Sequence, residues 1–181
     1  MDHLSSRSRR WKKQQTHLVM RTSLGKEDLE GFIRALFDQE RYGLLVAIKK
    51  MELPPVKEAE GEREFRVEVD ILSRLDHPNL VSLIGYCADG KQRFLVYEYM
   101  QNGNLQDHLN GIGEPKMDWP KRLKVALGAA RGLAYLHSSS AVGIPIVHRD
   151  LKSTNILLST NFDAKVRHLS KNLLKVEKAV Q

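Results

Sequence analysis

Short apolar runs alternate with polar segments in the first half of the chain, and they predict β-strands near residues 44–51, 80–87 and 94–100. Between the first two runs, apolar residues recur three or four positions apart from about Glu60 to Leu75, which predicts an amphipathic helix. Asp89-Gly90 is typical of a tight turn, so the last two strands are expected to form a hairpin.

The second half of the chain reads as helical. Asn102-Gly103 ends the strand run and is interpreted as a hinge between two lobes. A helix is expected to start at Asp118 as its N-cap, with Pro120 in its first turn. Its apolar face is predicted from residues at helical spacing, namely Leu123, Ala126, Ala130, Leu133 and Leu136. The pattern therefore predicts an α+β fold with a small β-rich lobe, one helix in it, and an incomplete helical large lobe.

The formal charge of +7 lies mostly in the two ends of the chain. Seven basic residues fall in residues 1–26 and five in residues 164–181, so the basic balance describes tails rather than a nucleic-acid-binding face. The run from Arg7 to Lys13 is compatible with a nuclear signal, with a patch for anionic lipid, or with a solvated arm, and we prefer the arm. No specific nucleic acid is expected as a partner.

No apolar run approaches the roughly 18 residues that a membrane span needs. The expected location is the cytoplasm, with a membrane-peripheral or nuclear location left open. The single cysteine, Cys87, cannot form an internal disulfide and lies in an apolar run, so we expect it in the core.

The segment His-Arg-Asp-Leu-Lys-Ser-Thr-Asn at residues 148–155 brings together side chains suited to phosphoryl transfer. The carboxylate of Asp150 can orient an acceptor hydroxyl and take its proton. Lys152 can offset the charge that develops on the transferring phosphate. The amide oxygen of Asn155 is a suitable ligand for Mg²⁺, which prefers oxygen donors.

A second group of candidate residues lies upstream. The run Val-Ala-Ile-Lys at residues 46–49 is typical of a buried strand that delivers one lysine, Lys49, to a site. Glu68 flanks the apolar stripe of the predicted helix, where it can form an ion pair with Lys49. Such a pair would direct the lysine toward the α- and β-phosphates of a nucleotide.

Together these segments resemble the protein kinase family, and most closely the plant receptor-like serine/threonine kinases. The resemblance covers about residues 44–166. Besides the two motifs above, it is carried by the segments at residues 75–81, 95–105 and 128–137.

The resemblance implies binding of ATP and Mg²⁺, which we expect to be weak in this chain, and a protein as substrate or signalling partner, whose identity the sequence does not give. It places Tyr97 behind the adenine as the gatekeeper, and assigns the adenine edge to backbone groups of Glu98 and Met100. Ala47 would line the roof of the adenine site and Leu157 its floor.

The chain departs from the family pattern in three places. Only Gly25, Gly31 and Gly43 stand where a glycine-rich loop is expected, no Asp-Phe-Gly triplet follows Val166, and the sequence stops at Gln181. We therefore expect a catalytically impaired, truncated form, with a pseudokinase or interaction module and an active serine/threonine kinase as the alternatives. We expect four divisions. Residues 1–43 are a basic arm with a degenerate start of the small lobe, and residues 44–100 are the small lobe. Residues 101–166 are a hinge with a partial large lobe, and residues 167–181 are a divergent tail.

Overall fold

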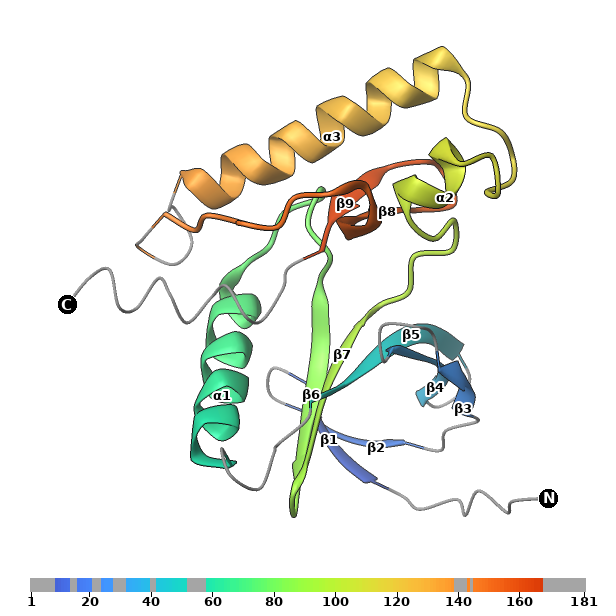
Figure 1. The fold of residues 1–181 in the computed structure, drawn as a ribbon. Helices are drawn as coiled ribbons and strands as arrows, with labels where there is room; N and C mark the ends of the chain where they lie inside the picture. The colour runs from blue at the N-terminus through green and yellow to red at the C-terminus, as the bar shows by residue number, and fades with distance from the viewer. Residues whose placement is uncertain are drawn as a thin grey trace. The chain divides into compact units, whose positions relative to one another are not determined.

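The structure is a computed structural model of the 181-residue chain. It describes residues 9–13, 16–20, 24–27, 32–39, 42–51, 58–138, 143 and 145–167, with side chains from Leu45 onward. Figure 1 shows its helices and strands, and the chain divides into two units. The sheet unit comprises Met1–Val69 and Leu83–Tyr99, and the helical unit comprises Asp70–Ser82 and Met100–Gln181.

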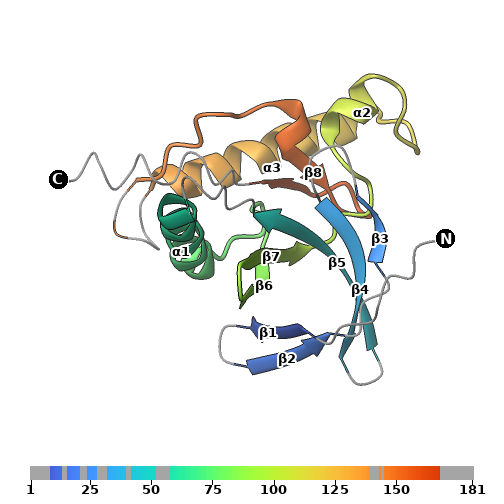
Figure 2. The ribbon, with the colours of Figure 1, turned by 60° about the horizontal axis from the view of Figure 1, so that its bottom comes forward.

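The sheet unit is built on one antiparallel sheet with the strand order β2-β1-β6-β7-β5-β4-β3 (Figure 2). Its strands are β1 Arg9–Lys13, β2 Thr16–Met20, β3 Leu24–Glu27, β4 Phe32–Gln39, β5 Tyr42–Met51, β6 Leu83–Asp89 and β7 Gln92–Glu98. Gly90 and Lys91 form the turn between β6 and β7, and Gly90 has a φ of 50°, which suits glycine at this position.

The predicted strands at residues 44–51 and 94–100 correspond to β5 and β7, but the one predicted at residues 80–87 starts later, at Leu83. Leu80 instead forms an isolated parallel bridge with Val166. No strand is predicted from the sequence before residue 44, whereas the described residues form four there, including β1 within the expected basic arm. Strand pairing uses backbone groups, so basic side chains do not prevent it. Of the glycines that stand where a glycine-rich loop is expected, Gly25 lies in β3 and Gly43 in β5, and Gly31 lies outside the described residues.

Helix α1, Glu58–Arg74, begins with acidic residues in its first turn and ends with Arg74, as the helix dipole favours. In the sheet unit the core lies on one face of the central strands. It contains Val46 and Ile48 of β5, Phe94 and Val96 of β7, and Cys87 of β6. The burial of Cys87 confirms its predicted place in the core.

The helical unit contains α2 Leu105–Leu109, α3 Trp119–His137, a short 3₁₀ helix Ser153–Asn155, and the hairpin of β8 Ile156–Leu158 and β9 Ala164–Val166. The predicted start of α3 is confirmed, because the Asp118 side chain accepts a hydrogen bond from the backbone N–H of Lys121 at 3.0 Å. No helix among the described residues is long and apolar enough to cross a membrane.

The predicted apolar face of α3 is largely wrong: Leu136 is buried, but Leu123 is 54% exposed. The helix instead buries a face of smaller side chains, namely Val125, Gly128, Ala129, Gly132 and Leu136. Small residues are needed there because α3 lies against β9 (Figure 1). A Cβ atom on Gly132 would stand 2.5 Å from the carbonyl oxygen of Asn79 and 3.3 Å from Cγ2 of Val166.

Candidate active site

In the sheet unit the strand register brings the candidate nucleotide-binding side chains to one face. Ala47 is paired with Tyr97, and Lys49 with Leu95. Directly paired residues in antiparallel strands point to the same face, so Lys49 and Tyr97 are diagonal neighbours. Because side chains alternate along a strand, this face is opposite to the one on which Val46 packs into the core.

Glu68 of α1 approaches this face, and the predicted ion pair is present. The Nζ atom of Lys49 lies 3.5 Å from Oε1 of Glu68, whose side chain is fully buried. The hydroxyl of Tyr97 donates to the same oxygen at 3.1 Å. The second oxygen, Oε2, is buried without a hydrogen-bond partner among the described residues. Glu68 therefore depends on two groups from the sheet, of which only the lysine was predicted from the sequence.

A second ion pair fixes α1 on the same face. Arg93, four residues before Tyr97 on β7, donates through Nε to Oε2 of Glu62 at 2.6 Å, and Arg66 donates to the other oxygen at 2.9 Å. The hydrogen bonds from these arginines lower the pKa of Glu62. These contacts help to hold the helix that presents Glu68 to Lys49.

The helical unit carries the segment at residues 148–155, and it brings the three predicted side chains together. The amide nitrogen Nδ2 of Asn155 donates to the backbone oxygen of Asp150 at 2.8 Å and to its Oδ2 at 3.2 Å. Nζ of Lys152 lies 3.3 Å from the same carboxylate oxygen. Asn155 is completely buried, whereas Asp150 and Lys152 reach solvent with 40% and 54% of their side chains. The buried amide thus orients a carboxylate that remains accessible.

Arg167, directly after β9, completes this cluster and was not predicted from the sequence. Its Nη2 donates to Oδ1 of Asn155 at 2.7 Å, and its backbone N–H donates to the backbone oxygen of Asn155 at 2.9 Å. Its own carbonyl oxygen lies 2.8 Å from Nε2 of His148. Only 9% of the residue is exposed. The arginine and the segment at residues 148–155 therefore form one buried hydrogen-bonded network.

Comparison with known proteins agrees with this geometry. The family model described as protein tyrosine and serine/threonine kinase matches residues 19–175. The chain belongs to this kinase family.

Its relatives in Arabidopsis thaliana are plant serine/threonine and receptor-like kinases. The chain is 76% identical over 136 residues to the probable serine/threonine-protein kinase PBL28, covering 75% of this chain and 36% of that protein. It is 53% identical over 124 residues to the proline-rich receptor-like protein kinase PERK5, covering 68% of this chain and 18% of that protein. The chain thus spans about a third or less of the length of these relatives.

Of the positions that the kinase resemblance assigns to adenine, Ala47, Tyr97 and Glu98 belong to the sheet unit and Met100 and Leu157 to the helical unit. Tyr97 and Met100 are buried, and the other three are half-buried. Leu157 is held in β8 by its pairing with Lys165 of β9. Their roles toward a nucleotide remain predictions.

The kinase family in general uses ATP together with Mg²⁺, and the described residues do not suit the metal ion. Oδ1 of Asn155, the predicted metal ligand, already accepts a hydrogen bond from a cation, Arg167. No three His, Cys, Asp or Glu side chains come together as a metal site within the described ranges. Magnesium prefers several oxygen ligands in near-octahedral geometry, and here it would meet a guanidinium instead of a second carboxylate.

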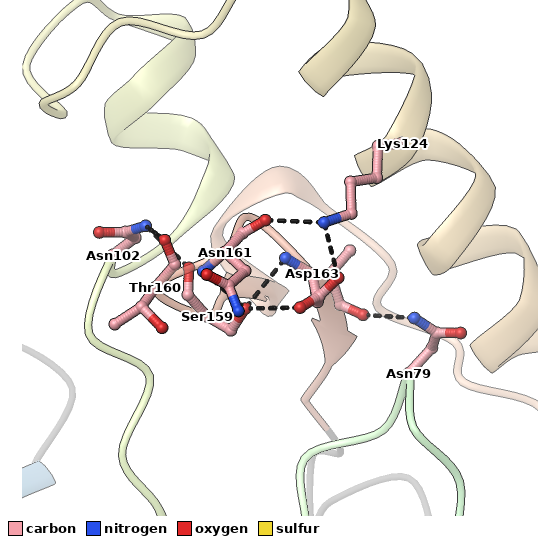
Figure 3. A network of polar contacts seen from close by, with 8 residues as sticks. Asn79, Asn102, Lys124, Ser159, Thr160, Asn161 and Asp163 are labelled. Atoms are coloured by element: carbon pink, nitrogen blue, oxygen red, sulfur yellow. Dashed lines mark hydrogen bonds and ion pairs between the residues drawn. The ribbon is translucent and has the colours of Figure 1, made fainter.

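The hairpin that delivers Arg167 is fixed by the polar network of its turn (Figure 3). Asp163 accepts hydrogen bonds from the hydroxyl of Ser159 at 3.1 Å and pairs with Lys124 of α3 at 2.8 Å. The contact with Lys124 is the main cause of a lowered pKa at Asp163. The side chain of Asn79 donates to the carbonyl oxygen of Ala164 at 2.8 Å. These contacts position the start of β9, three residues before Arg167.

Proposed function

We propose that this chain binds ATP and that its transfer of phosphate to serine or threonine is strongly impaired. The observation that carries the proposal is the contrast between two parts of the candidate site. Lys49 and Asp150 stand in the polar contacts that nucleotide binding and hydroxyl activation require, whereas the amide oxygen of Asn155 is already occupied by Arg167. The contacts of Lys49 support binding of ATP, and the occupied amide oxygen of Asn155 supports an impaired transfer.

The sheet unit would supply the contact to the phosphates. Lys49 is held by Glu68, which is fully buried and cannot turn toward solvent, so the direction of the lysine is restricted. A positioned ammonium group is worth more to a phosphate than a mobile one, because less side-chain entropy is lost on binding. Lys49 is therefore the side chain on which ATP binding should depend most.

The segment at residues 148–155 would supply the remaining chemistry. Asp150 would accept a hydrogen bond from a serine or threonine hydroxyl and take its proton, and Lys152 would offset charge on the phosphate. Nζ of Lys152 lies 3.3 Å from Oδ2 of Asp150, and both side chains remain solvent-accessible. A protein hydroxyl is the acceptor that fits the names of the relatives, which are serine/threonine-protein and receptor-like protein kinases.

The size of the impairment follows from the missing electrostatic contacts. Each lost contact to developing charge typically lowers the rate by a factor of about 100 to 1,000. The sequence has neither an Asp-Phe-Gly triplet after Val166 nor a complete glycine-rich loop before Lys49. Two such losses would reduce a kinase rate of about 1–100 per second to the order of 10⁻³ per second or less, even if they are not fully additive.

The experiment measures binding and transfer on the same preparation. Calorimetry should detect binding of ATP, and in Lys49→Met the affinity should fall by about tenfold or more. Lys50→Met is the control and should bind ATP normally, because Lys50 is the exposed neighbour on β5. Transfer of radiolabelled phosphate to a basic protein substrate should stay near the background without protein. Absence of ATP binding would contradict the first half of the proposal, and a transfer rate of about 1 per second would contradict the second.

A further inference from the structure

The guanidinium of Arg167 stands where the resemblance to kinases predicts a metal ion. The oxygen Oδ1 of Asn155 accepts from Arg167 at 2.7 Å, and the amide nitrogen of Asn155 donates to Asp150 on its other side. Because one side of the amide faces a cation and the other a carboxylate, its orientation is fixed. A metal ion bound to this oxygen would therefore lie directly beside the guanidinium of Arg167.

Displacement of Arg167 would disturb more than one hydrogen bond. The residue is 91% buried, and its backbone N–H and carbonyl are bound to Asn155 and His148. The preceding residue, Val166, is paired with Ile156 across the hairpin and donates to the carbonyl of Asn79 at 2.9 Å. The backbone on both sides of the Arg167 Cα is therefore held, and the side chain starts from a fixed point beside Asn155.

The charge of the cluster also disfavours a dication. Asp150 is its only carboxylate among the described residues, and Lys152 pairs with that carboxylate at 3.3 Å. Arg167 adds a second positive charge at the amide oxygen. A divalent ion placed on the same oxygen would be repelled by a guanidinium at close range in a buried environment, where screening by solvent is weak.

We propose that Arg167 takes the place of the divalent cation in this chain. Its guanidinium occupies the metal-ligating oxygen of Asn155 and provides there the positive charge that Mg²⁺ provides in the kinase family. The chain consequently binds the nucleoside triphosphate without a metal ion. This inference rests on the proposed function, because it names the form in which ATP is taken.

The first test uses Mn²⁺ as the probe, followed by the electron paramagnetic resonance signal of the free ion, with the full chain and without nucleotide. The unchanged chain should bind no Mn²⁺ at this site. Arg167→Asp replaces the guanidinium with a carboxylate beside the amide oxygen, and it should bind one ion. Lys165→Asp is the matched control, since it makes the same charge change on β9 at the position paired with Leu157 rather than beside Asn155. It should bind none.

The second test compares ATP binding by calorimetry in the presence of a chelator and of excess Mg²⁺. For the unchanged chain the two dissociation constants should agree within about threefold, whereas Arg167→Asp should bind at least about tenfold more tightly with Mg²⁺. If ATP binds under neither condition, the proposed function fails, and the Mn²⁺ titration still decides whether Arg167 excludes the metal.

Circular dichroism shows whether each variant is folded. If Arg167→Asp is not, Arg167→Ser removes the guanidinium without adding charge, and it should gain Mg²⁺ dependence of ATP binding or, failing ATP binding, measurable affinity for Mn²⁺. The proposal is overturned if the unchanged chain binds one Mn²⁺ that Asn155→Leu abolishes, or if the folded Arg167 variants gain no affinity for a metal ion. A structural role alone would change stability in these variants without creating a metal site.

Discussion

Replacing Lys49 with methionine should destabilise the sheet unit as well as weaken nucleotide binding. Among the described residues, Lys49 is the only cation that forms an ion pair with Glu68, and Glu68 is fully buried. Methionine has a similar length and no charge, so the substitution leaves the carboxylate with the hydroxyl of Tyr97 as its remaining described partner. A buried carboxylate without a cation is unfavourable, because water no longer solvates it.

The magnitude can be worked from the geometry. Two unit charges 3.5 Å apart attract by about 5 kcal/mol at an effective dielectric constant of 20. Removing one partner of a buried pair typically costs about 3–5 kcal/mol. The side chain of Lys49 is 18% exposed, and Tyr97 continues to donate to Glu68, so the expected loss is lower, about 2–3 kcal/mol. For a chain of this size that corresponds to a decrease of about 5–10 °C in Tm.

The assay is thermal unfolding together with hydrogen exchange of the amides of α1. Lys50→Met controls for the loss of a positive charge on the same strand. The double variant Lys49→Met with Glu68→Gln should recover part of the loss, since it removes the unpaired charge as well. The reasoning is refuted if Lys49→Met and Lys50→Met have the same Tm. It is also refuted if adding Glu68→Gln to Lys49→Met lowers stability by as much as Glu68→Gln lowers it in the unchanged chain.

Two further predictions concern the helical unit. Gly132→Ala should lower the free energy of unfolding by about 1–2 kcal/mol. The added Cβ would lie 2.5 Å from the carbonyl oxygen of Asn79, and this clash outweighs a gain of about 1 kcal/mol in helix propensity. Urea unfolding measures the difference, and a variant more stable than the unchanged chain would contradict the prediction. Burial and the nearby Arg131 lower the pKa of His77, so the folded state disfavours its protonation. Stability should fall as the pH decreases from about 7 through the ordinary histidine value of about 6.5, and His77→Phe should reduce that dependence in melts between pH 7 and pH 5, whereas an unchanged slope would speak against it.

The sequence was sufficient to predict those parts of the site that local patterns determine. The apolar run ending in Lys49 and the helical stripe beside Glu68 predicted a strand, a helix and an ion pair, and all three are present. The segment at residues 148–155 likewise predicted the proximity of Asp150 and Asn155, because the two lie only five residues apart. The proximity within this segment needs no knowledge of tertiary contacts, whereas the ion pair joins a strand to a helix and is a tertiary contact.

Prediction failed where packing between distant segments decides. Leu123 and Leu133 have the spacing of a buried stripe, yet α3 turns its glycine face toward Asn79 and β9. The hydrophobic pattern ranks Leu above Gly, whereas close approach to another backbone requires the absence of a side chain. Two glycines four residues apart, Gly128 and Gly132, were the available signal for this contact.

Arg167 shows why a missing motif does not by itself describe a site. From the sequence, the absence of Asp-Phe-Gly after Val166 indicates a lost metal ligand and nothing about what replaces it. In the folded chain, the hairpin register carries the next residue to Asn155, and a long side chain with several donors fills the position. The amide oxygen that would otherwise be left buried without a partner is satisfied from within the chain, which stabilises the network around Asp150. The same contact that orders this part of the chain is therefore expected to oppose the metal ion on which phosphate transfer in the kinase family depends.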